Sequence, residues 1–200
     1  MQFSDIDINL TYTYADYLKW QFEERIELIK GKIYKMSAPN RMHQKLSGFL
    51  FVNLYNYLNT KNCEVYSAPF DVRLPRKSKD DKDIITVVQP DICVICNTQI
   101  LDFKGCLGAP DIVIEILSPS NNVLELKNKY EIYEEVGVKE YWVVSPDIKT
   151  FLAYTLYNNK YKSSRLMVSG DIFTSSVLPD FSINMTDMFN KLDEYKLPTK

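Results

Sequence analysis

Residues 111–117 read Asp-Ile-Val-Ile-Glu-Ile-Leu, a run of branched apolar side chains interrupted by a carboxylate at Glu115. Such a run predicts a strand that is buried in a sheet. A second apolar run, residues 92–95, follows directly after Asp91. Burying an ionised carboxylate is costly unless a cation, a metal ion or hydrogen bonds compensate it. Two carboxylates on neighbouring buried strands would repel each other, so we expect a divalent metal ion between Asp91 and Glu115.

The two runs are expected to be neighbours in one sheet. Their connection, residues 97–109, is too short for the crossover helix that parallel strands require, so antiparallel pairing is expected. If the turn centres near Phe103, paired residues have numbers that sum to about 206, which places Asp91 opposite Glu115. A slip of one residue would turn one carboxylate to the other face.

Asp111 lies on the same face of the predicted strand as Glu115. Four residues along an extended strand span about 13 Å, however, which is too far for both to bind one metal ion directly. We expect Asp111 to cap the entrance of the strand or to bind the adjoining loop. For Asp91 an alternative stays open, namely a carboxylate beside Pro90 at the mouth of a strand. A purely structural role is a weaker interpretation for Glu115, because a charged side chain deep in an apolar strand needs a partner.

The rest of the chain alternates between helical and strand patterns. Helices are predicted over residues 14–24, over 41–58, and from 118 to 136 with an end at Gly137. Strand patterns predict a hairpin over 27–34 that turns at Lys30-Gly31, and strands over 65–74, 87–95, 111–117 and 141–144. Residues 150–189 are expected to form strands around turns at Asn158-Asn159 and Ser169-Gly170, and the tail from Lys191 is expected to fray. The order helix, three strands, helix, strand predicts an α/β fold with a β-rich C-terminal extension.

Composition limits the class of protein. The 200 residues, of which 46% are hydrophobic, fit a single domain, with a core over about residues 25–147 and a β extension over 148–190. The net charge of −2 argues against a protein that coats nucleic acid without sequence preference, but it is compatible with a local basic cleft. The sequence shows no secretion signal and no membrane-spanning run, so a cytoplasmic protein without a membrane partner is expected.

Four cysteines occur, at positions 63, 93, 96 and 106. The Cys93-x-x-Cys96 spacing could supply a zinc site with Cys106 as a third ligand. Residues three apart on a strand face opposite sides, however, whereas a zinc knuckle takes its pair from a tight turn. We therefore expect reduced thiols that pack as small apolar side chains. A cysteine-based metal or redox protein is the weakest of the functional hypotheses.

At these residues the chain resembles the PD-(D/E)XK nuclease superfamily, and more closely the Uma-type family of restriction endonucleases. The matching stretches span most of residues 25–147 in the expected order, and they are residues 27–31, 43–44, 88–91, 108–120 and 137–144. The resemblance implies a restriction-endonuclease-like core with a mixed central sheet and flanking helices. It also implies that Asp91 is the Asp of the Pro-Asp motif and Glu115 the acidic residue of the second motif.

The third element of the motif departs from the superfamily pattern. A standard motif places lysine two residues after Glu115, where this chain has Leu117. The resemblance implies that the lysine has moved onto the following helix, where Lys127 and Lys129 are the candidates.

Helical geometry separates these two lysines. The apolar stripe that defines the buried face consists of Leu126, Tyr130 and Tyr133. At 100° per residue, Lys129 lies about 60° from the centre of that stripe and Lys127 about 100° away. Lys127 also has Glu131 at the i+4 position. We therefore expect Lys129 to reach inward and Lys127 to pair with Glu131 in solvent.

The resemblance implies a metal-dependent endonuclease that hydrolyses phosphodiester bonds in DNA. Asp91, Glu115 and the Ile116 carbonyl would hold Mg²⁺ or Mn²⁺. Lys129 would orient or deprotonate the attacking water, or neutralise charge on the phosphate. The products would carry a 5′-phosphate and a 3′-hydroxyl. A homodimer would bring two such sites to a duplex.

The alternative function is a catalytically silent nuclease fold that serves as a binding or regulatory module. Leu117 and the acidic pI of about 5.5 favour it, whereas a binding scaffold has no need to bury opposed carboxylates. Two further residues have open roles. Glu27 is either an additional metal ligand or, the preferred interpretation, part of a surface salt bridge. His43 is either a catalytic base or, again preferred, a partly buried histidine with satisfied hydrogen bonds.

Overall fold

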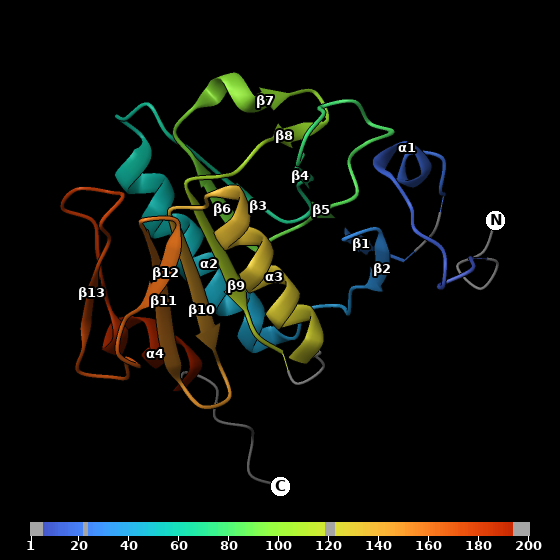
Figure 1. Cartoon of the computed structure of the whole chain (residues 1–200). Coiled ribbons are helices and arrows are strands. Elements are labelled where there is room, and N and C mark those ends of the chain that lie inside the picture. Colours follow the sequence, from blue (N-terminus) through green and yellow to red (C-terminus); the bar gives the residue numbers. More distant parts are fainter. Residues whose placement is uncertain (1–5, 22–23, 119–122, 194–200) are drawn as a thin grey trace, which may run out of the picture.

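The computed structural model describes residues 6–21, 24–118 and 123–193. Its central sheet has the strand order β12-β11-β10-β9-β6-β3, with helices α2 and α3 on its two faces (Figure 1). The strands are β3 (Glu64–Ser67), β6 (Ile92–Ile95), β9 (Ile112–Ile116), β10 (Glu140–Ser145), β11 (Thr150–Tyr157) and β12 (Lys160–Ser163), and the helices are α2 (Arg41–Leu58) and α3 (Val123–Val136). The series α2-β3-β6-β9-α3-β10 confirms the predicted order of the α/β fold.

The predicted register of the two carboxylate-bearing strands is confirmed. β6 and β9 are antiparallel, with Ile92 opposite Ile114 and Val94 opposite Ile112, so paired numbers sum to 206. One further step along this register brings Asp91 opposite Glu115. β9 then runs parallel to β10, and α3 is the crossover helix that this parallel pair requires.

A second sheet, in the order β2-β1-β5-β4-β8-β7, contains the predicted first hairpin. Its strands are β1 (Ile26–Ile29), β2 (Lys32–Lys35), β4 (Val72–Arg73), β5 (Val87–Val88), β7 (Leu101–Asp102) and β8 (Gly105–Leu107), and the short helix η2 (Thr98–Ile100) precedes β7. The strands predicted over 65–74 and 87–95 are therefore each divided between the two sheets. Pro69 and Pro90 fall inside them, and proline has no backbone N–H for a sheet ladder.

Apolar side chains cover both faces of the central sheet. α2 has the predicted bounds and buries Leu46, Leu50, Leu54 and Leu58 in one cluster, together with the three isoleucines of β9. On the other face, α3 packs Ile132 and Tyr133 near Val113. Because neighbouring residues of a strand alternate between faces, Glu115 points to the same side as Val113, toward α3. None of the helices in the described ranges has the length and apolar character needed to cross a membrane.

The first helix is shorter than predicted. α1 spans only Tyr14–Tyr17, where a helix over 14–24 was expected. Asp16 accepts hydrogen bonds from both the backbone N and the hydroxyl of Thr13, so these two residues cap the start of the helix. Residues 18–21 are a turn and irregular chain, and residues 22–23 lie outside the described part. The helix predicted from residue 118 is described from Val123 onward, because residues 119–122 also lie outside it.

The C-terminal region forms the predicted strands but ends in a helix. β11 and β12 are joined at Asn158-Asn159, and β13 (Ile172–Thr174) pairs with β14 (Ser182–Asn184). The prediction is wrong for residues 185–189, which begin α4 (Met185–Asp193). The missed signal is helical spacing of buried apolar residues at Met185, Met188, Phe189 and Leu192. Lys191 lies within α4, and the tail after residue 193 is outside the described residues.

Two cysteines form a disulfide, Cys63–Cys96, so the prediction of reduced thiols is wrong for this pair. β3 and β6 are antiparallel with Glu64 opposite Ile95, and the same register one residue further places Cys63 beside Cys96. Cys93 and Cys106 are free and buried, as predicted. Cys93 packs on the opposite side of the sheet from Cys96, so the zinc arrangement is not formed.

Two glycines provide a matched test of the hairpin turn. Gly31 has a φ of +76°, and a Cβ there would lie 2.3 Å from Cγ2 of Thr11. Gly48, on the exposed side of α2, has nothing within 4 Å of the place a Cβ would take. We expect Gly31→Ala to lower the free energy of unfolding by more than about 1 kcal/mol and Gly48→Ala to raise it by about 0.5–1 kcal/mol. Denaturant unfolding measures both, and a shift of the same sign in both variants would contradict this.

Candidate active site

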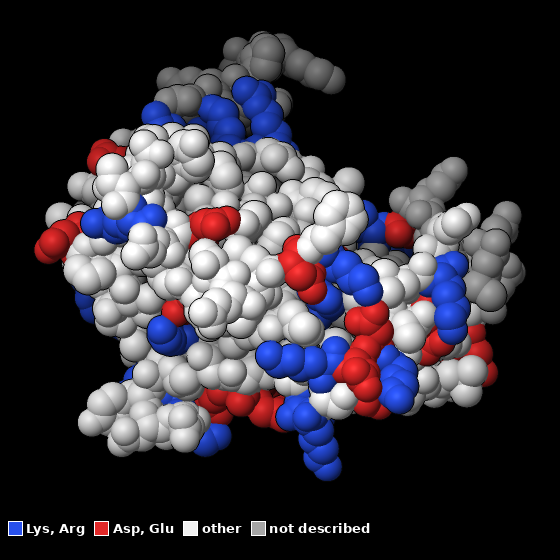
Figure 2. Space-filling view, turned by 90° about the horizontal axis from the view of Figure 1, so that it is seen from above, with Lys and Arg blue, Asp and Glu red and all other residues white. Residues whose placement is uncertain are grey.

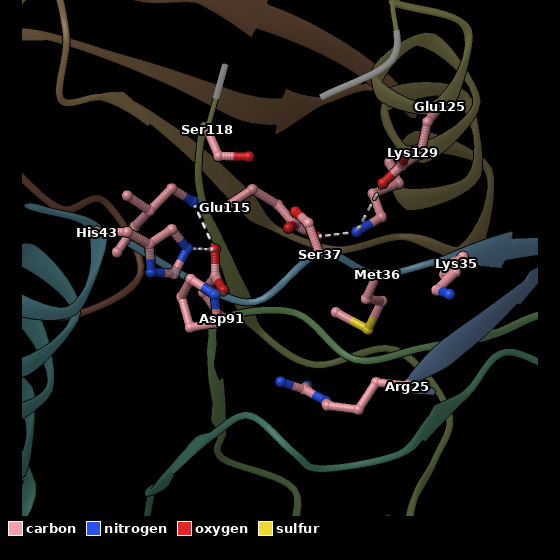
Figure 3. A pocket seen from close by; sticks show the side chains of 12 residues that line it. Arg25, Lys35, Met36, Ser37, His43, Asp91, Glu115, Ser118, Glu125 and Lys129 are labelled. Carbon is pink, nitrogen blue, oxygen red and sulfur yellow. Dashed lines mark hydrogen bonds and ion pairs between the residues drawn. The ribbon is translucent and has the colours of Figure 1, made fainter. Parts of the chain in front are cut away.

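A pocket of about 160 Å³ lies where β6 begins and β9 ends (Figure 3). α2 contributes His43 to its lining, the two paired strands contribute Asp91 and Glu115, and α3 contributes Glu125 and Lys129. The structure therefore brings the three main predicted site residues, Asp91, Glu115 and Lys129, into one pocket.

Asp91 is held through one of its oxygens. Oδ2 accepts a hydrogen bond from the backbone N of Ile116 at 2.7 Å and lies 3.1 Å from Nε2 of His43. The bond to Ile116 fixes Asp91 beside the end of β9 that carries Glu115. His43 is 7% exposed, and within the described residues its Nδ1 has no hydrogen-bond partner. His43 is thus buried against Asp91, as the preferred prediction had it, but only one of its ring nitrogens is satisfied.

Lys129 is 3% exposed and reaches inward from α3. Its Nζ lies 3.0 Å from Oε1 of Glu115 and 2.9 Å from Oε2 of Glu27, with Glu125 farther away at 3.8 Å. Burial lowers the pKa of Lys129, but Glu115 and Glu27 outweigh this effect and raise that pKa well above its usual value. The ammonium therefore stays charged at neutral pH, fixed between two carboxylates.

Lys127 behaves as helical geometry predicts. Its side chain is 70% exposed, and its Nζ lies 3.9 Å from Glu131. The choice of Lys129 as the inward-reaching lysine is therefore confirmed as to position, whereas its catalytic role stays a prediction.

Glu115 combines burial with two strong contacts on one oxygen. Tyr133 donates its hydroxyl to Oε1 at 2.8 Å, the same oxygen that Lys129 contacts. Burial raises the pKa of Glu115, an effect that Lys129 reduces and that Glu27 and Asp91 strengthen. Among the described residues, no hydrogen bond reaches Oε2 of Glu115 or Oδ1 of Asp91. Each carboxylate thus retains one oxygen for a ligand.

Glu27 is buried, so the preferred prediction of a surface salt bridge is wrong. It is 1% exposed on β1. Its Oε1 accepts a hydrogen bond from the backbone N of Gln89 at 2.8 Å, and its Oε2 faces Lys129. The second sheet encloses this side chain, which the pattern of a single hairpin does not reveal.

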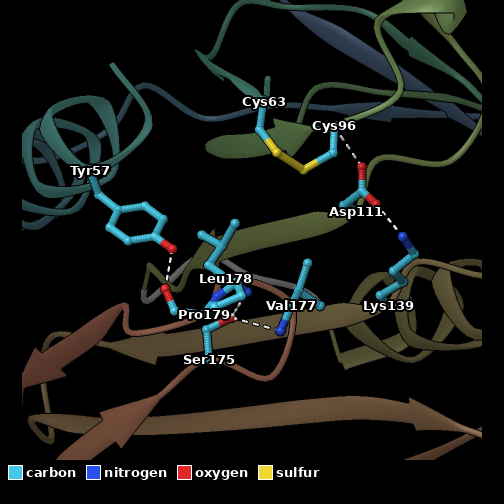
Figure 4. Close-up of a disulfide and its surroundings, with 9 residues drawn as sticks. All are labelled: Tyr57, Cys63, Cys96, Asp111, Lys139, Ser175, Val177, Leu178 and Pro179. Atoms are coloured by element: carbon cyan, nitrogen blue, oxygen red, sulfur yellow. Dashed lines mark hydrogen bonds and ion pairs between the residues drawn. A yellow bond between two sulfur atoms is a disulfide. The ribbon is translucent and has the colours of Figure 1, made fainter. Parts of the chain in front are cut away.

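Asp111 lies at the other end of β9 and does not line the pocket. Figure 4 shows it between Cys96 and Lys139. Its Oδ2 accepts a hydrogen bond from the backbone N of Cys96 at 2.6 Å, and its Oδ1 lies 2.6 Å from Nζ of Lys139. It binds the loop that enters β9, as expected, and it does not join Asp91 and Glu115.

Two residues that touch the buried cluster were not predicted, Tyr133 and Glu125. The apolar stripe of α3 predicts Tyr133 only as a buried side chain. Both lie four residues from Lys129, and side chains at that spacing share one face of a helix. The spacing was therefore a usable signal once Lys129 had been assigned an inward direction.

The carboxylate oxygens of the pocket suit a metal ion that needs few protein ligands. The described residues contain no group of three or more His, Cys, Asp or Glu side chains placed to hold a metal ion. Mg²⁺ commonly binds through one or two carboxylates and keeps several waters, so the two unused oxygens of Asp91 and Glu115 fit it. Glu27, Asp91 and Glu115 also outnumber the ammonium of Lys129 in this cluster, so a further cation would improve its charge balance.

Comparison with known proteins places this fold in a family. A crystal structure described as a putative nuclease belonging to DUF820, from Anabaena variabilis, matches with a TM-score of 0.70 at 20% identity and covers 90% of this chain and 99% of that one. A protein of Synechocystis sp. described as uncharacterized is 24% identical over 133 residues, which are 65% of this chain and 66% of that protein. The family model Uma2, described as "Putative restriction endonuclease", matches residues 14–186. The chain therefore belongs to the Uma2 family.

Proposed function

We propose that this protein is a metal-dependent endonuclease that hydrolyses phosphodiester bonds in DNA. The observation that carries the proposal is the placement of Asp91 and Glu115 at one end of two paired strands, with Lys129 bonded to Glu115. The descriptions of the family and of the Anabaena protein support the same chemistry.

Asp91 and Glu115 would hold Mg²⁺ or Mn²⁺, together with the carbonyl of Ile116 and water. The chemistry that such an ion supplies when bound is polarisation of a phosphoryl oxygen and a lowered pKa of a bound water. The chain itself keeps the two carboxylates in place, through the backbone N–H of Ile116 on Asp91 and the hydroxyl of Tyr133 on Glu115.

Lys129 contributes a positive charge at this place. Its ammonium is fixed by Glu115 and Glu27, and a protonated amine has no lone pair with which to accept a proton. Of the roles that the family resemblance allows, we therefore favour orientation of water and stabilisation of negative charge that develops on the phosphate.

Cleavage of a supercoiled plasmid tests the proposal. Wild-type protein with Mg²⁺ or Mn²⁺ is expected to produce nicked and linear DNA with 5′-phosphate ends, and EDTA is expected to stop the reaction. An Asp91→Asn preparation, purified in parallel, controls for contaminating nuclease. Equal cleavage by the two preparations would identify a contaminant and remove the proposal.

Metal binding without DNA separates the enzyme from the catalytically silent module. A ligand that binds only the folded state stabilises it, by about 2.7 kcal/mol at about a hundredfold excess over its Kd. We expect Mn²⁺ or Mg²⁺ to raise the Tm of the wild-type protein but not that of an Asp91→Asn/Glu115→Gln double variant. The silent module predicts no metal-dependent rise in either protein.

A further inference from the structure

Arg25 lines the pocket just before β1 (Figure 3). Its guanidinium bonds to a neutral amide. Its Nε and Nη2 donate to Oε1 of Gln89 at 3.2 and 2.8 Å. In the described part of the chain, these are the only hydrogen bonds of the guanidinium, and it forms no ion pair there. Arg73, Arg76 and Arg165, by contrast, each pair with a carboxylate. Among the described residues, the charge of Arg25 therefore has no carboxylate counterion, at the edge of the candidate pocket.

Gln89 holds this guanidinium in a fixed direction. Its amide Nε2 donates to Oδ1 of Asp71 at 2.8 Å and to the hydroxyl of Tyr17 at 3.2 Å. Because arginine only donates and an ionised aspartate only accepts, these neighbours determine which end of the amide faces Arg25. Gln89 is also 8% exposed, and its backbone N–H is bonded to Glu27. Arg25 is thus oriented before any ligand arrives, which lowers the entropic cost of binding one.

The remaining donors of Arg25 define the chemistry of its ligand. A guanidinium has five N–H donors, and two of them point to Gln89. An anion with several acceptor oxygens would accept hydrogen bonds from the remaining N–H donors, and the planar guanidinium of arginine suits phosphate. Carboxylates cannot attract such an anion, so Asp91 and Glu115 cannot provide this contact.

The overall charge gives DNA little general attraction to this protein. The net charge is −2, and acidic and basic side chains lie side by side on the face shown in Figure 2. Without a broad basic field, binding of the DNA backbone depends on individual, well-placed cations.

We propose that Arg25, positioned by Gln89, binds a backbone phosphate of the DNA next to the scissile one. This inference rests on the proposed function and adds a substrate contact to it. Arg25 is the contacting residue, and Gln89 is a positioning residue that acts through it.

Fluorescence anisotropy with a short labelled DNA duplex in EDTA tests the contact. An Asp91→Asn background prevents cleavage during the measurement. Adding Arg25→Gln is expected to weaken binding about tenfold and to reduce the slope of log Kd against log salt concentration by about one. The matched control is Arg76→Gln, which also removes one arginine charge but lies near the C-terminal end of α3 beside Glu135. It is expected to change neither quantity.

A double-mutant cycle tests the positioning role. Gln89→Met is expected to weaken binding about threefold while the salt slope stays unchanged, because Arg25 keeps its charge but loses its direction. In the Arg25→Gln protein the same change is expected to have no further effect. Independent losses from the two substitutions would show that Gln89 does not act through Arg25 and would overturn that half of the proposal.

The outcomes separate this inference from the nuclease proposal. If the wild-type protein cleaves plasmid but Arg25→Gln binds DNA as Arg76→Gln does, the phosphate contact is wrong and the nuclease stands. If binding depends on Arg25 but no preparation cleaves, the contact stands and the catalytic proposal fails. If the duplex does not bind even at the lowest salt concentration, the contact is wrong.

Discussion

Asp91→Asn is expected to lower the rate of metal-dependent plasmid cleavage by about 10²-fold to 10³-fold. The substitution keeps the shape of the side chain and an oxygen that can accept the hydrogen bond from Ile116, but it removes the negative charge that a divalent ion needs. A metal ion acting as a Lewis acid is worth several kcal/mol to the transition state, and about 1.4 kcal/mol corresponds to a tenfold change in rate. Initial rates measured at saturating Mn²⁺ and Mg²⁺ give the ratio.

Asp111→Asn is the matched control for this prediction. Asp111 also accepts a backbone N–H bond, from Cys96, and also faces a basic group, Lys139. It lies at the other end of β9, so its variant is expected to cleave at the wild-type rate. Equal losses in both variants would mean that cleavage reports the integrity of the sheet. Full activity in Asp91→Asn would contradict the assignment of a metal ligand.

The register of β6 and β9 could be predicted because the chain between them folds back on itself. That segment leaves the central sheet and forms β7 and β8 in the second sheet, which was not foreseen. It is itself an antiparallel hairpin, with Asp102 opposite Gly105, so it turns close to Phe103. The paired numbers of this hairpin sum to 207 and those of β6 and β9 to 206, so the excursion adds nearly equal lengths of chain on its two sides. The estimate for Asp91 and Glu115 therefore remained valid.

The residues that were misjudged depend on contacts between distant segments. The sequence of β1 shows a short hairpin strand, but Glu27 is buried because α3 and Gln89 close over it. Its partner Lys129 lies about a hundred positions further along the chain, and no local period connects the two. By contrast, the inward direction of Lys129 follows from the 3.6-residue repeat of α3 alone. Local periodicity predicts which side chains share a face of a helix or strand. Which other segment covers that face depends on how the elements pack, and no local pattern gives this.

Lys129→Met is expected to lower the free energy of unfolding by about 3–5 kcal/mol at neutral pH. The ammonium lies 2.9 Å from Glu27 and 3.0 Å from Glu115, and its removal leaves buried carboxylates without their cation, which carries a penalty of this size. Native proteins of this kind are stable by only about 5–15 kcal/mol, so the loss is a large fraction of the total. Denaturant unfolding monitored by circular dichroism measures it.

Lys127→Met is the control, because the same change is made two residues away on an exposed side chain that lies 3.9 Å from Glu131. Exposed ion pairs contribute little, so a shift within about 0.5 kcal/mol is expected.

The pH dependence gives a second measurement for Lys129→Met. Burial raises the pKa of Glu115 to about 8 and Lys129 opposes that rise, so the pKa of this carboxyl is expected to be higher still in the variant. The deficit relative to wild type should therefore shrink as the pH falls through the alkaline range toward about 8 and change little below it, because both folded proteins then hold the Glu115 proton. A deficit that is independent of pH, or no larger than that of Lys127→Met, would contradict a charged lysine between Glu27 and Glu115.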